Sequence, residues 1–268
     1  MNILDTIIAS KQAEVAARKI STPAAELEKS PFFQQPLPSL RYALQQRTTS
    51  GIIAEFKRRS PSKGNIHIDA DVLATTRAYA AGGAAGISVL TDESFFGGSW
   101  SDLDTAIQWG VPVLRKDFII DEYQLLEARA HGAAVILLIA ACLTPAAVKA
   151  LAQAARSLGM EVLLELHDQA ELEHIHPSVS LVGINNRNLK NFEVNWQHSI
   201  ELVAQLPTDI PAIAESGIDS IDTLLQLESA GFSGFLMGEY FMKQPDPGNA
   251  FLSFAAELNS VRKRNNIR

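Results

Sequence analysis

The sequence predicts an α/β protein of the TIM (β/α)8-barrel class with an N-terminal helical extension. Eight short, β-branched and almost continuously apolar runs recur about every 20 to 30 residues, as expected for strands that are covered on both faces. Helical patterns lie between them, and eight βα units in about 210 residues match a TIM barrel. A doubly wound open sheet is the alternative. Eight units would be many for that fold, and no Gly-x-Gly-x-x-Gly follows the first run.

The runs expected to form strands are 51–56 (GIIAEF), 84–90 (AAGISVL), 111–116 (VPVLRK), 134–139 (AVILLI), 161–166 (EVLLEL), 180–185 (SLVGIN), 210–215 (IPAIAE) and 233–238 (SGFLMG). Between them, helical patterns include 69–83, 121–132, 144–159 and 220–231. Gly83, Gly132 and Gly231 end their patterns at positions where a helix C-cap is expected.

The N-terminal region follows a different pattern from the rest of the chain. Apolar residues such as Ile3, Ile7 and Val15 recur at helical spacing over the first twenty residues, which predicts an amphipathic helix. A proline-punctuated stretch follows, and 40–46 has the pattern of a second short helix. We therefore expect residues 1–48 to form a helical extension packed on a barrel of residues 49–268, within a single domain overall.

Composition limits the classes of partner and compartment. The net charge of −7 and the pI near 5.4 argue against a nucleic acid or an anionic membrane held by bulk charge, so any anion must be bound by a local cluster of residues. The single Cys142 excludes an intrachain disulfide framework and is expected to be a buried, unreactive thiol. No targeting segment stands out, and the apolar run 133–143 is too short to span a bilayer. We expect a cytoplasmic protein with no nucleic-acid or membrane partner.

Polar side chains gather where the expected strands end, which is the active-site end of a TIM barrel. They are Glu55, Lys57, Lys116, Asp117, Glu165, Asn185, Arg187, Glu215 and Ser216. Structural alternatives exist: Glu55 and Lys57 could simply pair, Lys116 and Asp117 could form a solvated strand end, and the 185–187 stretch could be a turn. A purely surface role is the alternative for Glu165, although apolar residues precede it. His167, His174 and His176 lack clear metal-ligand spacing, so we expect exposed histidines and no metal site.

Two glycine-containing turns point to an anion site. Glu215-Ser216-Gly217 and Met237-Gly238-Glu239 follow the last two strands, where barrels often bind phosphate through backbone N–H groups. Lys57, which follows the first strand, would supply positive charge beside them. Glycines that serve only the turn geometry are the alternative for each loop.

Five segments resemble the indole-3-glycerol-phosphate synthase family. They are AEFKRRSPSKG (54–64), VLRKDFIID (113–121), LLELHD (163–168), GINNRNL (183–189) and AIAESGI (212–218). The resemblance covers nearly the whole chain, including the N-terminal helix. It implies an enzyme of tryptophan biosynthesis that closes the indole ring of a carboxyphenylamino-deoxyribulose phosphate with loss of carbon dioxide and water. It implies no metal and no organic cofactor.

The resemblance also implies roles for individual residues. Lys116 would be the general acid at the C2′ carbonyl, Glu165 the acid/base partner for the dehydration, and Glu55 and Asn185 would orient the substrate hydroxyls. The implied substrate-binding residues are Lys57, Ser60, Arg187, Ser216, Gly217, Gly238 and Glu239, and those lining the apolar pocket are Pro61, Phe96, Phe118, Leu137 and Leu189. Many family members have a small serine in place of Glu239, so we expect its backbone N–H to serve the phosphate; the orientation of its side chain stays open.

Three other functions fit parts of the pattern. Lys116 could form a Schiff base on a sugar phosphate, as in a class I aldolase. The barrel could be a non-catalytic binding module. A phosphoribosylanthranilate isomerase would need a reactive cysteine paired with an aspartate, and Cys142 follows the wrong strand for that. The sequence does not fix the oligomeric state, for which we expect a monomer or a weak homodimer.

Overall fold

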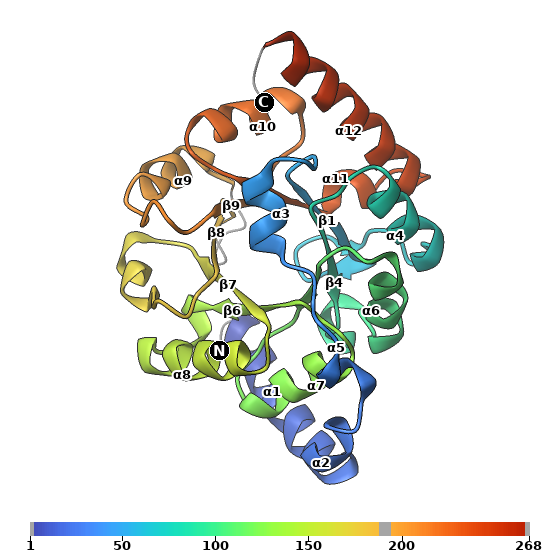
Figure 1. The fold of residues 1–268 in the computed structure, drawn as a ribbon, viewed down its shortest axis with the longest axis vertical. Coiled ribbons are helices and arrows are strands. Elements are labelled where there is room, and N and C mark those ends of the chain that lie inside the picture. The colour runs from blue at the N-terminus through green and yellow to red at the C-terminus, as the bar shows by residue number, and fades with distance from the viewer. Residues whose placement is uncertain (1–2, 188–193, 266–268) are drawn as a thin grey trace.

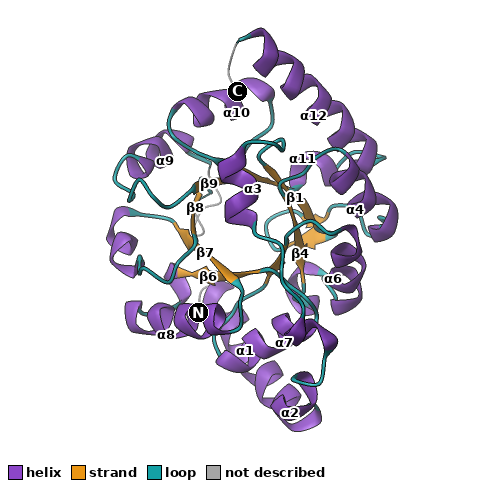
Figure 2. Cartoon of the chain, viewed as in Figure 1, coloured by secondary structure: helices purple, strands orange, loops and turns teal. Residues whose placement is uncertain are grey.

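Eight parallel strands close into a barrel in the computed structural model, which describes residues 3–187 and 194–265. Around the barrel they run β1 (Ile52–Phe56), β10 (Gly234–Met237), β9 (Ala212–Glu215), β8 (Leu181–Asn185), β7 (Glu161–Leu166), β6 (Val135–Ile139), β5 (Val113–Lys116) and β4 (Gly86–Leu90). All eight neighbouring pairs are parallel, and helices surround the ring of strands (Figure 1, Figure 2). The predicted barrel class is confirmed.

The outer helices follow the strands in sequence order. They are α4 (Val72–Ala81), α5 (Glu93–Phe96), α6 (Trp100–Ala106), α7 (Glu122–Ala130), α8 (Pro145–Ser157), α9 (Trp196–Val203), α10 (Ile221–Ser229), α11 (Glu239–Met242) and α12 (Pro247–Arg264). Short 3₁₀ helices occupy Ile107–Trp109, Ala140–Cys142 and Gln169–His174. Gly83, Gly132 and Gly231 follow the ends of α4, α7 and α10 with positive φ, as expected for the C′ position of a helix.

The period of two along each strand sorts its side chains into an inner and an outer set. Inside the barrel, Ile53, Leu114, Leu163 and Ile213 belong to one apolar cluster. Two residues further along the same strands lie Glu55, Lys116, Glu165 and Glu215. The alternation therefore places a charged layer directly above an apolar layer, at the carboxyl ends of the strands.

The N-terminal segment contributes α1 (Ile3–Ser21), α2 (Ala24–Leu27), the 3₁₀ helix Pro31–Gln34 and α3 (Leu40–Gln46). A Cβ built on Gly86 or Gly234, the first residues of β4 and β10, would meet Leu40 or Leu44 of α3. Helix α3 therefore closes the amino-terminal end of the barrel, which it crosses in Figure 1. Helix α1 lies at the opposite end, where Ile3, Leu4 and Ile7 line a cavity together with Lys116 and Phe118.

A small hairpin interrupts the connection from β1 to α4. Strands β2 (Arg59–Ser60) and β3 (Gly64–Asn65) pair in antiparallel fashion, and Arg59 donates to the backbone carbonyls of Glu93 and Ser94. This hairpin contains most of the predicted 54–64 motif and places it beside the barrel mouth. None of the helices in the described part of the chain has the length and apolar character needed to cross a membrane.

Candidate active site

Lys116 lies at the centre of the charged layer. Its Nζ atom is 3.4 Å from Glu165 Oε2 on β7 and 3.9 Å from Glu215 Oε2 on β9. Burial alone would lower the pKa of Lys116, but Glu165, Glu215 and Glu55 together raise it above its ordinary value. The lysine is therefore an ammonium group at neutral pH, held at the point where it can donate a proton into the mouth.

Glu165 is the ionised carboxylate of this layer. Its Oε1 atom accepts a hydrogen bond from Asn185 Nδ2 at 3.0 Å and lies 3.2 Å from His167 Nε2. Burial alone would raise the pKa of Glu165, but Lys116 and then His167 and Asn185 hold it well below its usual range. The two oxygens thus have different partners, one facing Lys116 and the other facing Asn185 and His167.

Glu215 has the opposite electrostatic character. Its side chain is buried, its Oε1 atom has no hydrogen-bond partner among the described residues, and a Cβ on Gly183 would lie 2.0 Å from that oxygen. Burial and then the charge of Glu165 raise the pKa of Glu215 to about 8, which Lys116 only partly offsets. At neutral pH Glu215 is a carboxylic acid, so the layer pairs a carboxylate base with a protonated acid. The position of Glu215 at this strand end was predicted from the sequence, but its chemical role was not.

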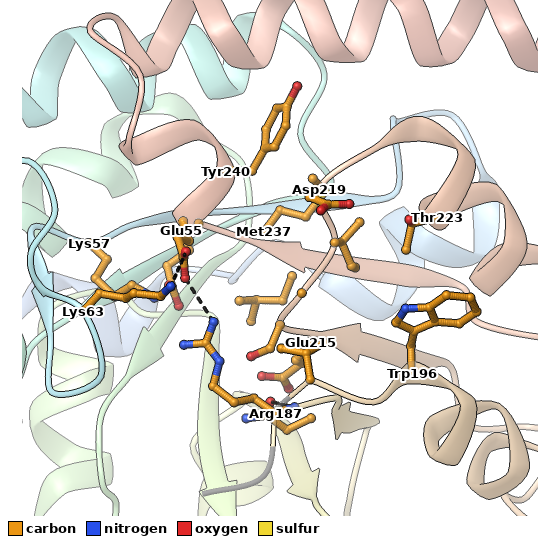
Figure 3. A pocket seen from close by; sticks show the side chains of 18 of the residues that line it. Glu55, Lys57, Lys63, Arg187, Trp196, Glu215, Asp219, Thr223, Met237 and Tyr240 are labelled. Carbon is orange, nitrogen blue, oxygen red and sulfur yellow. Dashed lines mark hydrogen bonds and ion pairs between the residues drawn. The ribbon is translucent and has the colours of Figure 1, made fainter. Parts of the chain in front are cut away.

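Glu55 and Lys57 form an ion pair, as their spacing allowed. Burial alone would raise the pKa of Glu55, but Lys57 and then Lys116 hold it below its ordinary value. A Cβ on Gly238 would lie 2.5 Å from Glu55 Oε1 and 2.8 Å from Glu55 Cβ, so glycine is required where β10 ends against this carboxylate. The pair does not exclude a role in a site, because both residues line the same cavity (Figure 3).

This first cavity has a volume of about 500 Å³ and is lined by the residues that were predicted to form an anion site. Besides Glu55 and Lys57 it is lined by Lys63, Lys116, Asn185, Arg187, Glu215, Ser216, Gly217, Gly238 and Glu239, among others. Ser216 and Gly217 adopt φ values of 68° and 72°, a left-handed conformation that is uncommon for serine. Such strain tends to occur at functional sites, where the surrounding structure maintains it.

The structure answers the question that the sequence left open about Glu239. Its side chain does not turn away from the site: Glu239 Oε2 is 3.0 Å from Arg187 Nη2, and Oε1 is 3.5 Å from Lys63 Nζ. Arg187 Nη1 also donates to Ser62 Oγ at 3.1 Å. The carboxylate therefore links the β8 end to the 57–66 loop across the cavity wall, and part of the local positive charge is neutralised by the protein itself.

A second cavity, of about 150 Å³, is more apolar and shares Lys57, Lys116, Asn185, Arg187 and Ser216 with the first. It is lined by the predicted residues Ser60, Pro61, Phe96, Phe118 and Leu137, and also by Ile3, Leu4 and Ile7. Leu189 lies outside the described residues. The contribution of the N-terminal helix was not foreseen, although its apolar stripe was visible in the sequence.

The expectation of exposed histidines was wrong for all three, since His174 is buried and His167 and His176 are half-buried. His174 is buried, with ring nitrogens 3.1 Å from Glu171 O and 3.0 Å from Leu143 O. His167, whose side chain is 12% exposed, lies between Glu165 and Glu171. Burial alone would lower the pKa of His167, but Glu165 and Glu171 raise it to about 10, so the ring is a cation. The signal that could have found it is the period of two, since His167 follows Glu165 by two residues.

Two other groups bear on alternative chemistries. Cys142 is half-buried, and burial followed by the charge of Glu165 raises the pKa of its thiol to about 12, which disfavours a thiolate nucleophile. In the described ranges 3–187 and 194–265, no three His, Cys, Asp or Glu side chains are arranged to hold a metal ion.

Comparison with known proteins places these features in a family context. Residues 4–254 match the family model described as "Indole-3-glycerol phosphate synthase". Proteins of that name from Bacteroides thetaiotaomicron and Salinibacter ruber are 46% and 42% identical to the chain; the alignments cover 94% and 97% of it, and 97% and 98% of those relatives.

Solved structures of other barrels resemble the fold. Thiamine phosphate pyrophosphorylase from Pyrococcus furiosus matches with a TM-score of 0.60 at 15% identity, over 83% of this chain and 99% of that one. The tryptophan synthase alpha subunit from Legionella pneumophila matches with a TM-score of 0.60 at 12% identity, over 84% of this chain and 98% of that one. At such low identity, these matches support the barrel fold and nothing finer.

Proposed function

The chain belongs to the indole-3-glycerol phosphate synthase family, and we propose that its charged layer and two joined cavities catalyse the reaction of that family. The enzyme is a carboxy-lyase of tryptophan biosynthesis. It converts 1-(2-carboxyphenylamino)-1-deoxyribulose 5-phosphate to indole-3-glycerol phosphate, carbon dioxide and water. The observation that carries the assignment of its site is the position of Lys116, protonated between Glu165 and Glu215 where the two cavities meet.

The two cavities match the two ends of this substrate. The first cavity would bind the phosphate through Lys57 and the backbone of Ser216, Gly217, Gly238 and Glu239. The second would bind the carboxyphenyl ring against Phe96, Phe118, Leu137 and Pro61. A substrate held at both ends would have its C2′ carbonyl where the two cavities meet, beside Lys116. This positioning lowers the entropic cost of ring closure.

Ring closure would begin when the ring carbon that bears the carboxylate attacks C2′. Lys116 donates its proton to the C2′ oxygen as the new carbon–carbon bond forms, which converts the carbonyl to a hydroxyl. The ring nitrogen then carries an iminium charge. The carboxylates of Glu55 and Glu165 stabilise this cation electrostatically at short range. Carbon dioxide leaves, and its bonding electrons return to the ring and neutralise the iminium nitrogen.

Dehydration would complete the reaction. The nitrogen lone pair expels the C2′ hydroxyl, which takes up a second proton and leaves as water, and loss of the proton from C1′ forms the aromatic indole. Glu165 serves this step as acid/base partner, while Asn185 and Glu55 orient the hydroxyl groups of the substrate. Two protons are consumed and one is released, so that one proton is taken up per turnover.

The charge state of Lys116 favours this function over the aldolase alternative. A Schiff-base lysine must be a neutral amine, whereas the acidic side chains around Lys116, with Glu165 first among them, raise its pKa. Sodium borohydride added with substrate should therefore trap no adduct on Lys116, and a covalent adduct there would favour the aldolase. The position and raised pKa of Cys142 likewise disfavour the isomerase.

The test of the proposed function is direct. Purified protein is incubated with the substrate without added metal, and indole fluorescence is followed. Lys116→Met is expected to lower kcat/KM by about 10²- to 10⁴-fold, the range for a lost general acid, with inorganic phosphate still binding. Lys149→Met, an exposed substitution on α8, is the control. No fluorescence from wild-type protein that binds phosphate would refute the assignment, and a binding module would tolerate Lys116→Met.

The setting of the enzyme remains part of the proposal. We propose that it acts in the cytoplasm as a monomer or weak homodimer, without a nucleic-acid or membrane partner, which the net charge of −7 supports. Residues 1–48 would act as an extension of the 49–268 barrel rather than as a separate unit. Sedimentation at several protein concentrations tests the oligomeric state.

A further inference from the structure

Lys11, on the N-terminal helix α1, is a buried cation outside the catalytic layer. The residue is 1% exposed. Its Nζ atom lies 2.8 Å from Glu14 Oε2, 3.0 Å from Asp92 Oδ2 and 3.0 Å from Asp117 Oδ1. The side chains of Asp92 and Asp117 are 2% and 0% exposed. Buried charges are costly unless they are paired, so the stability of Lys11, Asp92 and Asp117 in their charged forms depends on their contacts with one another.

The two aspartates follow different strands. Asp92 follows β4, and its Oδ1 atom accepts the backbone N–H of Phe95 at 2.7 Å, which caps helix α5. Asp117 directly follows Lys116 at the end of β5. Its Oδ1 atom accepts the N–H of Phe118 at 2.8 Å, and its Oδ2 atom accepts from Thr91 and Arg115. Lys11 is therefore the point at which α1 is joined to both strand ends.

The three segments joined by Lys11 form the apolar cavity. Helix α1 contributes Ile3, Leu4 and Ile7, helix α5 contributes Phe96, and the segment after Asp117 contributes Phe118. The rings of Phe96 and Phe118 are 6.1 Å apart between centroids. Asp92 and Asp117, the two buried partners of Lys11, themselves border this cavity.

We propose that Lys11 is a positioning residue for the aromatic end of the substrate, an inference that rests on the proposed function. Its ammonium group holds α1, α5 and the 117–118 segment at the separation that fits a carboxyphenyl ring. It touches no reacting atom, and the lining of the phosphate cavity includes none of Lys11, Asp92 or Asp117. Loss of Lys11 should therefore weaken binding of the ring and leave binding of phosphate unchanged.

Lys11→Met tests this selectivity, with Lys19→Met as the matched control. Lys19 is on the same helix and joins it to the start of α7 through an exposed ion pair with Asp121, 2.7 Å long. We expect Lys11→Met to raise the KM of the substrate and the inhibition constant of indole-3-glycerol phosphate about tenfold or more, with kcat changed less than about threefold. Inhibition by inorganic phosphate, and every constant of Lys19→Met, should change less than about twofold.

A variant that keeps the charge and one that relieves the buried carboxylates separate positioning from general stability. Lys11→Arg is expected to recover most of the substrate affinity. If Lys11→Met fails to fold, the same constants are measured on the double variant Lys11→Met/Asp92→Asn. This variant leaves Asp117 paired with Arg115 and preserves a side-chain oxygen that caps α5. In either background the raised KM must appear without a change in phosphate inhibition.

The inference and the proposed function fail in different ways. Wild-type enzyme that forms no indole refutes the proposed function. Active wild-type enzyme together with a folded Lys11 variant whose KM is unchanged refutes the role of Lys11 alone. Equal weakening of phosphate and product binding, or the same effect in Lys19→Met, would also refute it, because the residue would then act only through overall stability.

Discussion

Replacing Glu215 with glutamine tests the assignment of a protonated acid in the catalytic layer. The pKa of Glu215 rises from an ordinary value of 4.5 to about 8, because burial and the charge of Glu165 oppose its ionisation. A raised carboxyl pKa means that the folded state binds a proton which the unfolded state has already lost above pH 4.5. The free energy of unfolding must therefore fall as the pH rises from 4.5 to about 8.

The size of this effect follows from the same values. Each pKa unit corresponds to 1.36 kcal/mol, so the full difference approaches about 5 kcal/mol above pH 8. Glutamine cannot ionise and avoids this cost. Relative to the wild type, Glu215→Gln should gain stability steadily between pH 4.5 and pH 8, with no further gain above that pH.

The same substitution has a consequence for activity. An ionised Glu215 would place a charge 3.9 Å from Lys116 Nζ, an attraction of about 4 kcal/mol at an effective dielectric constant of 20. That attraction opposes release of the proton of Lys116, so wild-type kcat should fall as the pH rises through about 8. Glu215→Gln should retain kcat within about threefold at pH 7 and should lose this alkaline decline.

Urea unfolding and kcat measured from pH 5 to pH 9 check both expectations, with Glu257→Gln, an exposed position on α12, as the control. Parallel stability profiles for wild type and Glu215→Gln would refute a raised pKa. Loss of activity at pH 7 with the fold intact would show that the reaction requires the carboxyl group of Glu215 itself, which contradicts the expected retention of kcat.

Three further substitutions follow from individual contacts. His167→Gln removes a cation whose pKa is raised to about 10 by Glu165 and Glu171. The stability advantage of the wild type over this variant should therefore be complete below pH 6.5 and should disappear as the pH rises through about 10. Thermal melts over this pH range check the expectation, and an advantage independent of pH would contradict it. Glu239→Gln removes the carboxylate that pairs with Arg187 and Lys63, so the inhibition constant of inorganic phosphate should fall to about one third of the wild-type value or below. Competition kinetics at low salt measure this constant, and weaker inhibition would contradict the neutralising role. Gly238→Ala would place a Cβ 2.8 Å from Glu55 Cβ, so kcat/KM should fall by about tenfold or more while circular dichroism stays unchanged; full activity would show that Glu55 can move without cost.

Much of the fold and part of the site could be predicted from local pattern. The eight apolar runs lie within three residues of the observed strand boundaries, because a strand covered on both faces must be apolar along its length. Parallel strands in a closed barrel end at one rim, so polar residues at strand ends, such as Lys116, Glu165 and Asn185, had to meet there. The period of two then aims their side chains inward.

Side-chain chemistry that depends on distant partners could not be predicted in this way. The same sequence pattern is compatible with Glu215 ionised or protonated, and only its burial, with the charge of Glu165 nearby, makes the neutral form the stable one. His167 was expected to be exposed because the histidines after its strand lack clear metal-ligand spacing. The 3₁₀ helix Gln169–His174 instead brings Glu171 back to it.

The helical extension marks the boundary between the two kinds of information most clearly. Its amphipathic spacing was sufficient to predict helix α1 and its apolar stripe, because helix periodicity is a property of neighbouring residues. Nothing in that spacing indicates that Lys11 meets Asp92 and Asp117, which lie far along the chain at the ends of two other strands. Closure of the barrel brings these segments together, and the cost of burying a charge then requires that the three side chains pair.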